Sequence, residues 1–470
     1  MNIKKINNNI IIFTGMSILF ILCISANINI FKNNLFEMST FFIIAFICII
    51  RISFFEKYTY SLDSFHFLFI YLFTVIAPLY QIGSGEFPWD LSVSNQPIYK
   101  ANLLIIIWML IYMISYKFIK DKKGNLKVKF VKYNKNNNRY FNVNCKRANV
   151  IIILISLISL LVLIREYGFA NLFSRSLSNS VMQNNLKSTG LIISVFVRSL
   201  PIACFAVLIF KIKMLGHKNY ISAIITFILL VVSNFPTGTA RYWMGVVYLG
   251  SIILIFNKLF EKYRLIEMIG IFGMIIIFPV INIFRYITLS EFSFSDLNFT
   301  RIADMSIFLS GDFDAYSMFL RTIRVVDLTG SVYFYELLGS ILFFVPRAFW
   351  VMKPEGSGPY IAKMEGLTFT NLSEPIFAEG YLNLGIIGLI IFSIFLGMIL
   401  AYIDKSYWKD YKNKVLNVLT IFYPFLLGNI FTNFRGSLMV TLAYTIGQML
   451  AFFTIYHIYI YSCKIKIIKK

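Results

Sequence analysis

Long apolar runs recur along almost the whole of this 470-residue chain and constrain its fold more than any other feature. A run of about 17–25 apolar residues is the length that an α-helix needs to cross a lipid bilayer. Hydrophobic residues make up 58% of the chain and charged residues only 14%, too few polar groups to cover the core of a soluble protein. The sequence therefore predicts an all-α polytopic membrane protein with about twelve transmembrane helices. The predicted spans are residues 10–31, 36–55, 62–82, 98–119, 148–164, 191–210, 220–236, 242–257, 266–284, 384–403, 416–433 and 437–462.

Lysine and arginine gather in alternate loops, which predicts the orientation. With the N-terminus inside, the inner loops are the basic ones, as the positive-inside rule requires. The net charge of +22 is thus interpreted as an orientation signal, and no nucleic-acid partner is expected. The first run lacks a small-residue cleavage site, so we expect it to be retained, with both termini in the cytoplasm. The basic inner segments are residues 117–147, 211–219, 257–264, 404–414 and 464–470; the inner loop 51–60 is only weakly basic.

One predicted outer segment, residues 285–383, is far longer than the others and divides the chain. It separates the first nine predicted spans (1–284) from the last three and the tail (384–470). It carries seven basic and eleven acidic residues, opposite in balance to the whole chain, and loops of this length are uncommon unless functional. Residues 336–346 are too short to span and are expected to lie at the outer interface. Apolar residues at helical spacing also predict an amphipathic helix, formed by Ile302, Met305, Leu309, Phe313, Tyr316, Leu320 and Ile323.

Arginines at the predicted outer ends of helices are the main candidate site residues. Arg241 lies in "FPTGTARYW" (235–243) and Arg435 in "TNFRGS" (432–437), two short hairpins, while Arg198 lies inside the sixth predicted span. Each could be an interfacial anchor that reaches the headgroups. Several outer arginines together nevertheless depart from the positive-inside rule. The guanidinium fork suits bidentate contact with phosphate, so a lipid pyrophosphate is the expected ligand.

The stretch "FFVPRAFWVMKPEGSGPY" (343–360) adds two more outer cations, Arg347 and Lys353, before a stiff turn. We expect both to meet the pyrophosphate at headgroup depth. Arg241, Arg347 and Arg435 are therefore the predicted catalytic cations. Substrate binding is assigned to Arg198, Lys353, Arg321 and Arg324.

A carboxylate of the same outer segment is the candidate general base. Glu379, in "EPIFAEGYLNLG" (374–385), is preferred because it lies just before the tenth predicted span. Its alternative interpretation is an acid at a helix start, favoured there by the helix dipole. Asp312 and Asp314 are the reserves.

No metal or cofactor site is expected, although the acidic outer segment leaves a divalent ion bound by carboxylates as an open alternative. The three histidines, at positions 66, 217 and 457, are scattered, and none lies in the outer segment. No histidine and cysteine cluster has the ligand spacing of a zinc site, and no glycine-rich phosphate loop with its lysine is present.

Four of these stretches together resemble the Wzy-type O-antigen polymerases, the bacterial oligosaccharide repeat-unit polymerases. They are "TGTARYW" (237–243), "VPRAFWVMKPEGSG" (345–358), "EPIFAEGYLNLGIIGLIIFSIFLGMIL" (374–400) and "FRGSLMVTLAYTIGQ" (434–448). The layout is also similar, with many spans, one long late outer loop and short arginine hairpins. The resemblance implies a GT-C-like helical glycosyltransferase of the bacterial inner membrane.

The same resemblance implies the reaction and the partners. Undecaprenyl-pyrophosphate-linked oligosaccharides would serve as donor and acceptor and be polymerised into O-antigen, capsule or a related polysaccharide on the periplasmic face. No metal or nucleotide sugar would be needed. Membrane lipid, a chain-length regulator and a flippase are the further partners implied.

Other functions stay open at this point. A flippase or transporter of lipid-linked oligosaccharide needs a charged central cavity, whereas the predicted spans carry few charges, Arg198 being the main one. O-antigen ligases, which the chain resembles less closely, typically offer an outer-loop histidine that is missing here. A glycosyltransferase that uses a lipid-linked sugar usually shows an acidic motif in its first outer loop, which here is only "KNNLFEMST" (32–40).

Overall fold

The computed structural model describes residues 3–25, 35–56, 58–92, 96–122, 145–174, 188–277 and 305–468, with short pieces between 280 and 293. These residues form helices joined by turns, with one isolated β-bridge between Phe87 and Leu91. Most of the predicted inner loop 120–147 lies outside the described residues, as do Ile302 and the end of the first predicted span.

Within the described chain, nine helices are long and apolar enough to cross a membrane, so an all-α polytopic membrane protein is confirmed. The eighth and ninth predicted spans correspond to shorter apolar helices, residues 241–255 and 266–277, and the eleventh corresponds to the 18-residue helix 418–435, which is not among the nine. The count of twelve therefore stays a prediction. The nine long helices are Asn8–Ser25, Phe36–Phe55, Leu62–Ser84, Ile98–Asp121, Lys146–Tyr167, Ser194–Leu215, Tyr220–Gly238, Ile376–Lys412 and Leu438–Cys463.

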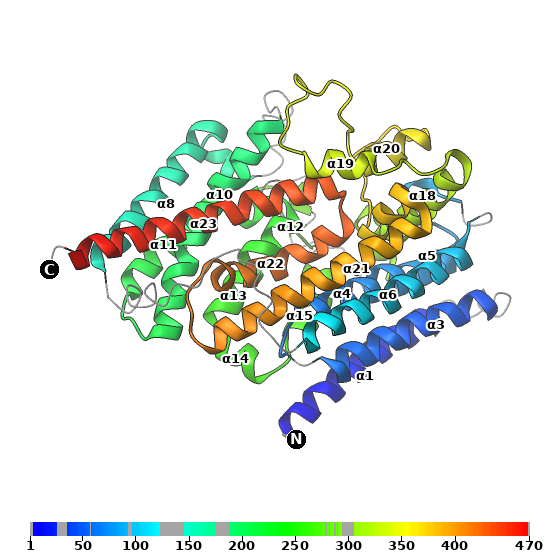
Figure 1. Ribbon diagram of the computed structural model, residues 1–470, viewed down its shortest axis with the longest axis horizontal. Helices are drawn as coiled ribbons and strands as arrows, with labels where there is room; N and C mark the ends of the chain where they lie inside the picture. Colours follow the sequence, from blue (N-terminus) through cyan, green and yellow to red (C-terminus); the bar gives the residue numbers. More distant parts are fainter. Residues whose placement is uncertain are drawn as a thin grey trace.

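The bundle has two flanks joined by its last three helices (Figure 1). One flank contains α1 (Ile3–Ser25), α3 (Leu35–Ile50), α4 (Leu62–Tyr71), α5 (Ala77–Ser84) and α6 (Ile98–Asp121). The other contains α8 (Lys146–Tyr167), α10 (Ser188–Leu215) and α11 (Tyr220–Ser233). Helix α21 (Ile376–Lys412) packs along α6, and α23 (Leu438–Ile468) packs along α10, with α22 (Val418–Arg435) between them. The shorter central helices are α12 (Arg241–Met244), α13 (Gly250–Ile255), α14 (Asn257–Lys262) and α15 (Ile266–Phe272).

Three helices of the long predicted loop gather at one end of the bundle (Figure 1). They are α18 (Ala315–Thr329), α19 (Tyr335–Ile341) and α20 (Ser357–Met364). The charge pattern predicts that this end faces outward, and we call it the outer end. The short helix expected within residues 336–346 corresponds to α19.

The predicted amphipathic helix is shorter than its apolar spacing indicated. Met305 has a positive φ of 59°, and residues 306–309 and 311–313 form two separate 3-10 turns, η10 and η11. Helix α18 begins only at Ala315. Its apolar face is buried as predicted, through Tyr316, Leu320 and Ile323. The break creates the acidic turn "GDFD" (311–314), which forms part of the site described below.

Helix α21 begins earlier than the predicted tenth span. It starts at Ile376, and Gly385, with a φ of +56°, bends it into a short outer piece and a long spanning piece. The bend brings Gly388 so close to the Gly380 carbonyl that a Cβ at position 388 would lie 2.1 Å from that oxygen. Glu379 therefore lies in the first turn of the helix rather than in the loop before it.

A close glycine contact brings the two arginine hairpins together. The helical segment that starts at Arg241 continues through a π-helical turn, η6 (Gly245–Leu249), which packs against α22. A Cβ at Gly428 would lie 2.4 Å from the carbonyl oxygen of Gly245, so only a glycine allows this approach. Small residues are typical of such close packing between membrane helices. The crossing places Arg241, at the start of one helix, near Arg435, at the end of the other.

Candidate functional site

A cavity of about 1010 Å³ lies at the junction of the two flanks, toward the outer end. Its walls come from α10, α12 with η6, the helical segment 266–277, and the facing ends of α22 and α23. Arg198, Arg241 and Arg435, which the sequence singled out separately, all line it. The structure thus brings three of the predicted cations to one cavity.

Arg241 is held by the acidic turn. Its Nη1 and Nη2 donate to the two carboxylate oxygens of Asp312, the second contact at 2.8 Å. The hairpin that carries Arg241 is fixed in turn by its glycine, because a Cβ at Gly238 would lie 1.7 Å from the carbonyl oxygen of Leu172. Thr237 adds a hydrogen bond of 2.6 Å to the Phe173 carbonyl. The fork of Arg241 is therefore pre-oriented before any ligand arrives.

Arg435 is held by the same turn through Asp314. Its Nε and Nη2 donate to Asp314 Oδ1 at 3.1 and 2.9 Å, and Nη2 also donates to the Gly311 carbonyl at 2.6 Å. Asp314 is fully buried. It also accepts from Ser373 Oγ at 2.5 Å and from Trp89 Nε1 at 2.9 Å. The two reserve carboxylates, Asp312 and Asp314, therefore serve here as partners of the arginines.

Arg198 approaches the cavity from α10. Its side chain is buried, donates from Nη1 to the Ser233 carbonyl at 3.0 Å, and lies over the ring of Tyr167 at 5.1 Å from the centroid. A buried arginine in a membrane span is costly unless it is paired or functional. Its position on the cavity wall is consistent with the predicted role in anion binding.

Aromatic side chains form much of the rest of the wall. Tyr242 and Tyr444 stack with ring centroids 5.7 Å apart and planes 10° apart, and Trp89 stacks on Phe369 at 5.3 Å. All four line the cavity. Aromatic faces with a polar edge suit the packing and hydrogen bonding of sugar rings.

Trp89 occupies an unusual backbone conformation, with a φ of 63° that L-residues rarely adopt. Asp314 holds its indole, and Arg321 donates to its carbonyl oxygen. Arg321 and Arg324 both pair with Glu365. Burial and the charge of Arg324 lower the pKa of Arg321 to about 10. Neither arginine lines the cavity. Arg321 acts on the cavity wall indirectly, through its hydrogen bond to Trp89.

Arg347 and Lys353 lie apart from this cavity. Arg347 donates to the carbonyl oxygens of Lys353 and Pro354, and Lys353 donates to those of Phe343 and Val345, at 2.6 and 2.9 Å. Neither residue lines the cavity. The two cations donate to backbone carbonyls of their own loop, and their contact with a pyrophosphate stays a prediction.

Glu379 is fully buried and does not line the cavity. Its Oε1 accepts hydrogen bonds from Ser357 Oγ and, at 2.6 Å, from the backbone N–H of Leu438, the first residue of α23. Ser357 Oγ lies 3.1 Å from Ser437 Oγ, and Ser437 lines the cavity. Glu379 is thus linked to the cavity through two hydroxyls.

Glu374, two residues before the start of α21, is also buried and accepts from Thr322 Oγ1 at 2.7 Å. Burial and the nearby carboxylates of Glu379, Asp314 and Glu336 raise the pKa of Glu374 well above its usual range. Within the described part of the chain, no group of three or more histidine, cysteine, aspartate or glutamate side chains could hold a metal ion.

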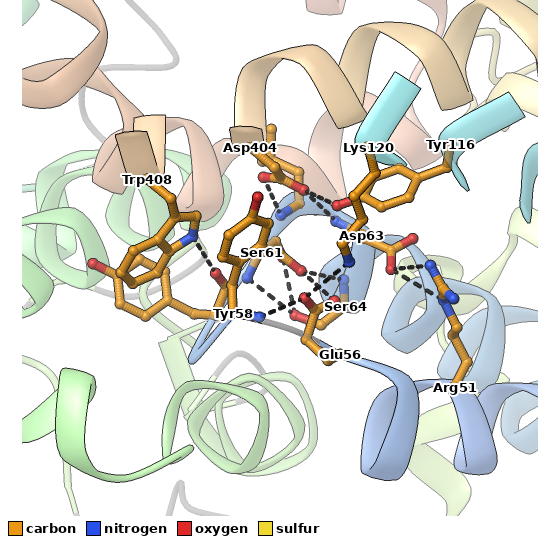
Figure 2. A network of polar contacts seen from close by, with 12 residues as sticks. Arg51, Glu56, Tyr58, Ser61, Asp63, Ser64, Tyr116, Lys120, Asp404 and Trp408 are labelled. Atoms are coloured by element: carbon orange, nitrogen blue, oxygen red, sulfur yellow. Dashed lines mark hydrogen bonds and ion pairs between the residues drawn. The ribbon is translucent and has the colours of Figure 1, made fainter. Parts of the chain in front are cut away.

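A second polar network lies at the opposite end of the bundle, where α4 begins and α6 and α21 end (Figure 2). Asp404 accepts from the backbone N–H groups of Leu62 and Asp63 at 3.0 and 3.3 Å, and from Tyr116 Oη at 2.8 Å. Asp63 pairs with Arg51 at 2.8 Å. The network supplies partners for the first N–H groups of α4, which a helix start otherwise leaves unpaired.

Buried charges lie mainly at the ends of the predicted spans: Asp63 and Glu267 are the second residues of two spans, and Lys211, Arg264 and Asp404 lie just outside others. Most have partners distant in sequence, which a single sequence does not reveal. Of the residues at the outer site, Ser357 and Ser437 were not predicted as functional from the sequence. Ser437 follows Arg435 by two positions in "FRGS", which was the available signal.

Comparison with protein-family models, with curated proteins and with solved structures finds no match for this chain.

Proposed function

We propose that this protein is a glycosyltransferase of the bacterial inner membrane that polymerises undecaprenyl-pyrophosphate-linked oligosaccharide repeat units. The product would be O-antigen, capsule or a related surface polysaccharide, formed at the outer face. The observation that carries the proposal is the convergence of Arg198, Arg241 and Arg435 on one cavity walled by aromatic rings. Three cations suit a pyrophosphate, and the rings suit the sugars joined to it.

The chemistry asks little more of such a site. The donor is already activated, because its sugar is bonded to a pyrophosphate that can leave as an anion. The protein has to hold the acceptor hydroxyl against that sugar carbon and stabilise the charge that develops on the departing phosphate. Arg241 and Arg435 are held by Asp312 and Asp314, so their orientation costs little at the moment of reaction.

The test is polymerisation of purified lipid-linked repeat units by the purified protein in EDTA. Lysine at position 241, 435 or 198 keeps the charge but loses the bidentate fork. We expect Arg241→Lys and Arg435→Lys to lower the rate by about 10²–10³-fold, the usual effect of removing one fixed donor to a developing anion. Arg165→Lys is the matched control, because Arg165 is an exposed arginine at the end of α8.

Each outcome is decisive. Full-length polymer from all three lysine variants would show that these arginines are not the anion site. Loss of wild-type activity in EDTA would show that a metal ion takes part. If the wild-type protein binds the lipid-linked repeat units but makes no polymer, polymerisation is rejected.

Transport of the same lipid-linked sugars is a second candidate, favoured by the buried charges around Asp404 and Asp63 (Figure 2). A flippase is expected to move the lipid between the leaflets of a proteoliposome without joining repeat units. Measuring translocation and polymer in the same vesicles separates the two functions.

A further inference from the structure

A chain of hydroxyl groups connects the cavity to the fully buried carboxylate of Glu379. Ser437 lies on the cavity wall, Ser357 Oγ lies 3.1 Å from Ser437 Oγ, and Ser357 Oγ contacts Glu379 Oε1. The three residues come from the start of α23, the start of α20 and the first turn of α21. All three side chains are buried, Ser437 being 6% exposed, Ser357 1% and Glu379 0%.

The direction of these hydrogen bonds follows from the number of protons. A serine hydroxyl has one proton to donate and two lone pairs that accept. Ser357 donates its proton to Glu379. It must therefore accept from Ser437 in the 3.1 Å contact. With its proton committed to Ser357, Ser437 offers a lone pair to whatever hydroxyl occupies the cavity.

A helix-capping role accounts for only part of the geometry of Glu379. Oε1 accepts from the N–H of Leu438, as a carboxylate at the start of α23 should. Oε2 has no hydrogen-bond partner among the described residues although it is buried. Capping alone also gives no reason for two serines to line up between the carboxylate and the cavity. A carboxylate with spare acceptor capacity at the end of a hydroxyl chain is the arrangement of a proton acceptor.

We propose that Ser437 and Ser357 relay a proton from the acceptor sugar to Glu379, an inference that rests on the proposed polymerase function. The acceptor hydroxyl gives its proton to Ser437, Ser437 gives its own to Ser357, and Ser357 gives its own to Glu379. The acceptor oxygen then forms its bond to the donor sugar carbon as the bond from that carbon to the pyrophosphate oxygen breaks. The bonding pair leaves with the pyrophosphate, which the arginines bind, and Glu379 ends neutral.

Removing single hydroxyls tests the relay without removing the cap. Ser437→Ala leaves the contacts of Glu379 with Ser357 and Leu438 in place, and Ser357→Ala breaks the chain at its other link. We expect Glu379→Gln to lower kcat by about 10²–10⁴-fold, the usual contribution of a general base, and both alanine variants to approach that loss. KM should stay near the wild-type value, and Ser437→Thr, which keeps a hydroxyl, should recover activity. Ser340→Ala is the control, since Ser340 is a buried serine of α19 that bonds only its own helix at Glu336 O.

The double variant Ser437→Ala with Glu379→Gln gives the sharpest measurement. If the two residues belong to one relay, the losses of kcat caused by the two substitutions should not add, so the kcat of the double variant should equal that of Glu379→Gln alone. The fall of wild-type kcat at low pH, where the base becomes protonated, should also disappear in both alanine variants. If either alanine variant does not fold, the other carries the measurement.

The outcomes separate this inference from the proposed function. Wild-type polymerisation with unchanged kcat and pH profile in Ser437→Ala and Ser357→Ala would overturn the relay and leave the polymerase intact. A fold-loss of kcat in the double variant equal to the product of the two single fold-losses would also overturn the relay, because the effects of independent residues on the activation free energy add. A wild type that makes no polymer removes the polymerase, and the relay with it.

Discussion

Asp314 and Arg435 are 121 residues apart in the chain, yet Asp314 Oδ1 accepts from both Nε and Nη2 of Arg435, at 3.1 and 2.9 Å. The carboxylate is fully buried while the arginine is partly open to the cavity. The pair therefore fixes one side of the guanidinium and leaves the cavity side for a ligand. Asp312 does the same for Arg241 from the same turn. One short acidic turn thus orients two arginines from separate hairpins.

Replacing Asp314 with asparagine should destabilise the outer end of the bundle. In the wild type, one carboxylate oxygen of Asp314 accepts from the Trp89 indole N–H and the other accepts from Arg435. Asparagine replaces one of these oxygens with an N–H₂ group, which is a donor, so in either orientation of the amide a donor faces a donor. A buried donor facing a donor leaves both unpaired, at a cost of about 1–3 kcal/mol. We expect a lower midpoint of thermal unfolding in detergent for Asp314→Asn.

Asp327→Asn is the matched control for that measurement. Asp327 pairs with Lys100, but both side chains are nearly half exposed. Exposed ion pairs contribute only about 0–1 kcal/mol, so its midpoint should stay close to that of the wild type. An equal shift in the two variants would contradict the structural role given to Asp314.

The sequence predicted most of the fold and about half of the site, for physical reasons. Length and apolarity alone identify a membrane helix, so the nine long helices were predictable. They do not show where a helix breaks, which depends on backbone geometry such as the bend at Gly385 or the positive φ of Met305. Glu379 was therefore predicted just before a helix that in fact begins at Ile376, and the amphipathic helix was predicted to begin earlier than Ala315.

The cations were predicted because an outer arginine departs from a compositional rule. The positions of these side chains in the folded protein were not predicted, because they depend on contacts between segments that are distant in the sequence. Arg241 and Arg435 meet at the cavity only through the crossing of Gly245 with Gly428. Arg347 and Lys353, equally prominent in the sequence, bind carbonyls of their own loop.

Gly238→Ala should disturb the site although the residue carries no side chain. The added Cβ would lie 1.7 Å from the Leu172 carbonyl oxygen, a clash that only a backbone shift can relieve. The shift would move the hairpin that carries Arg241, so we expect lower polymerisation and a lower thermal midpoint. Gly15→Ala is the control, because Gly15 does not line the cavity and a Cβ there would make only an ordinary contact, 3.4 Å from the Met268 side chain. A normal rate and midpoint for Gly238→Ala would show that the hairpin adapts freely.

The predicted orientation can be tested with single cysteines on the two ends of the bundle. Met352 is 77% exposed in the outer segment, and Asn413 is exposed between α21 and α22. The five native cysteines are all buried and can be replaced first. In intact cells, an impermeant thiol reagent should label Met352→Cys, and it should label Asn413→Cys only after the membrane is opened. The reverse pattern would place the arginine cavity in the cytoplasm.

Stability should fall as pH rises from about 4.5 to 7 because of Glu336, which lies outside the spanning helices. Burial raises the pKa of Glu336 to about 7, the nearby charge of Glu355 adds to the rise, and the Gly356 N–H and Arg347 oppose it. In this pH window the folded state holds the proton while the unfolded state has lost it. Unfolding therefore releases a proton and becomes more favourable with each step in pH. Below the window both states are protonated, and above it both are ionised, so the dependence should level off.

Glu336→Gln removes this titration while keeping the size of the side chain. The thermal midpoint of the variant, measured in detergent at several pH values, should exceed that of the wild type above pH 7 by the full amount lost across the window. Below about pH 4.5 the difference should vanish, because the wild-type carboxyl is then neutral as well. Other groups titrate in both proteins, so the quantity to follow is the difference between the two curves. A difference that stays constant with pH would show that the pKa of Glu336 is the same in the folded and the unfolded protein.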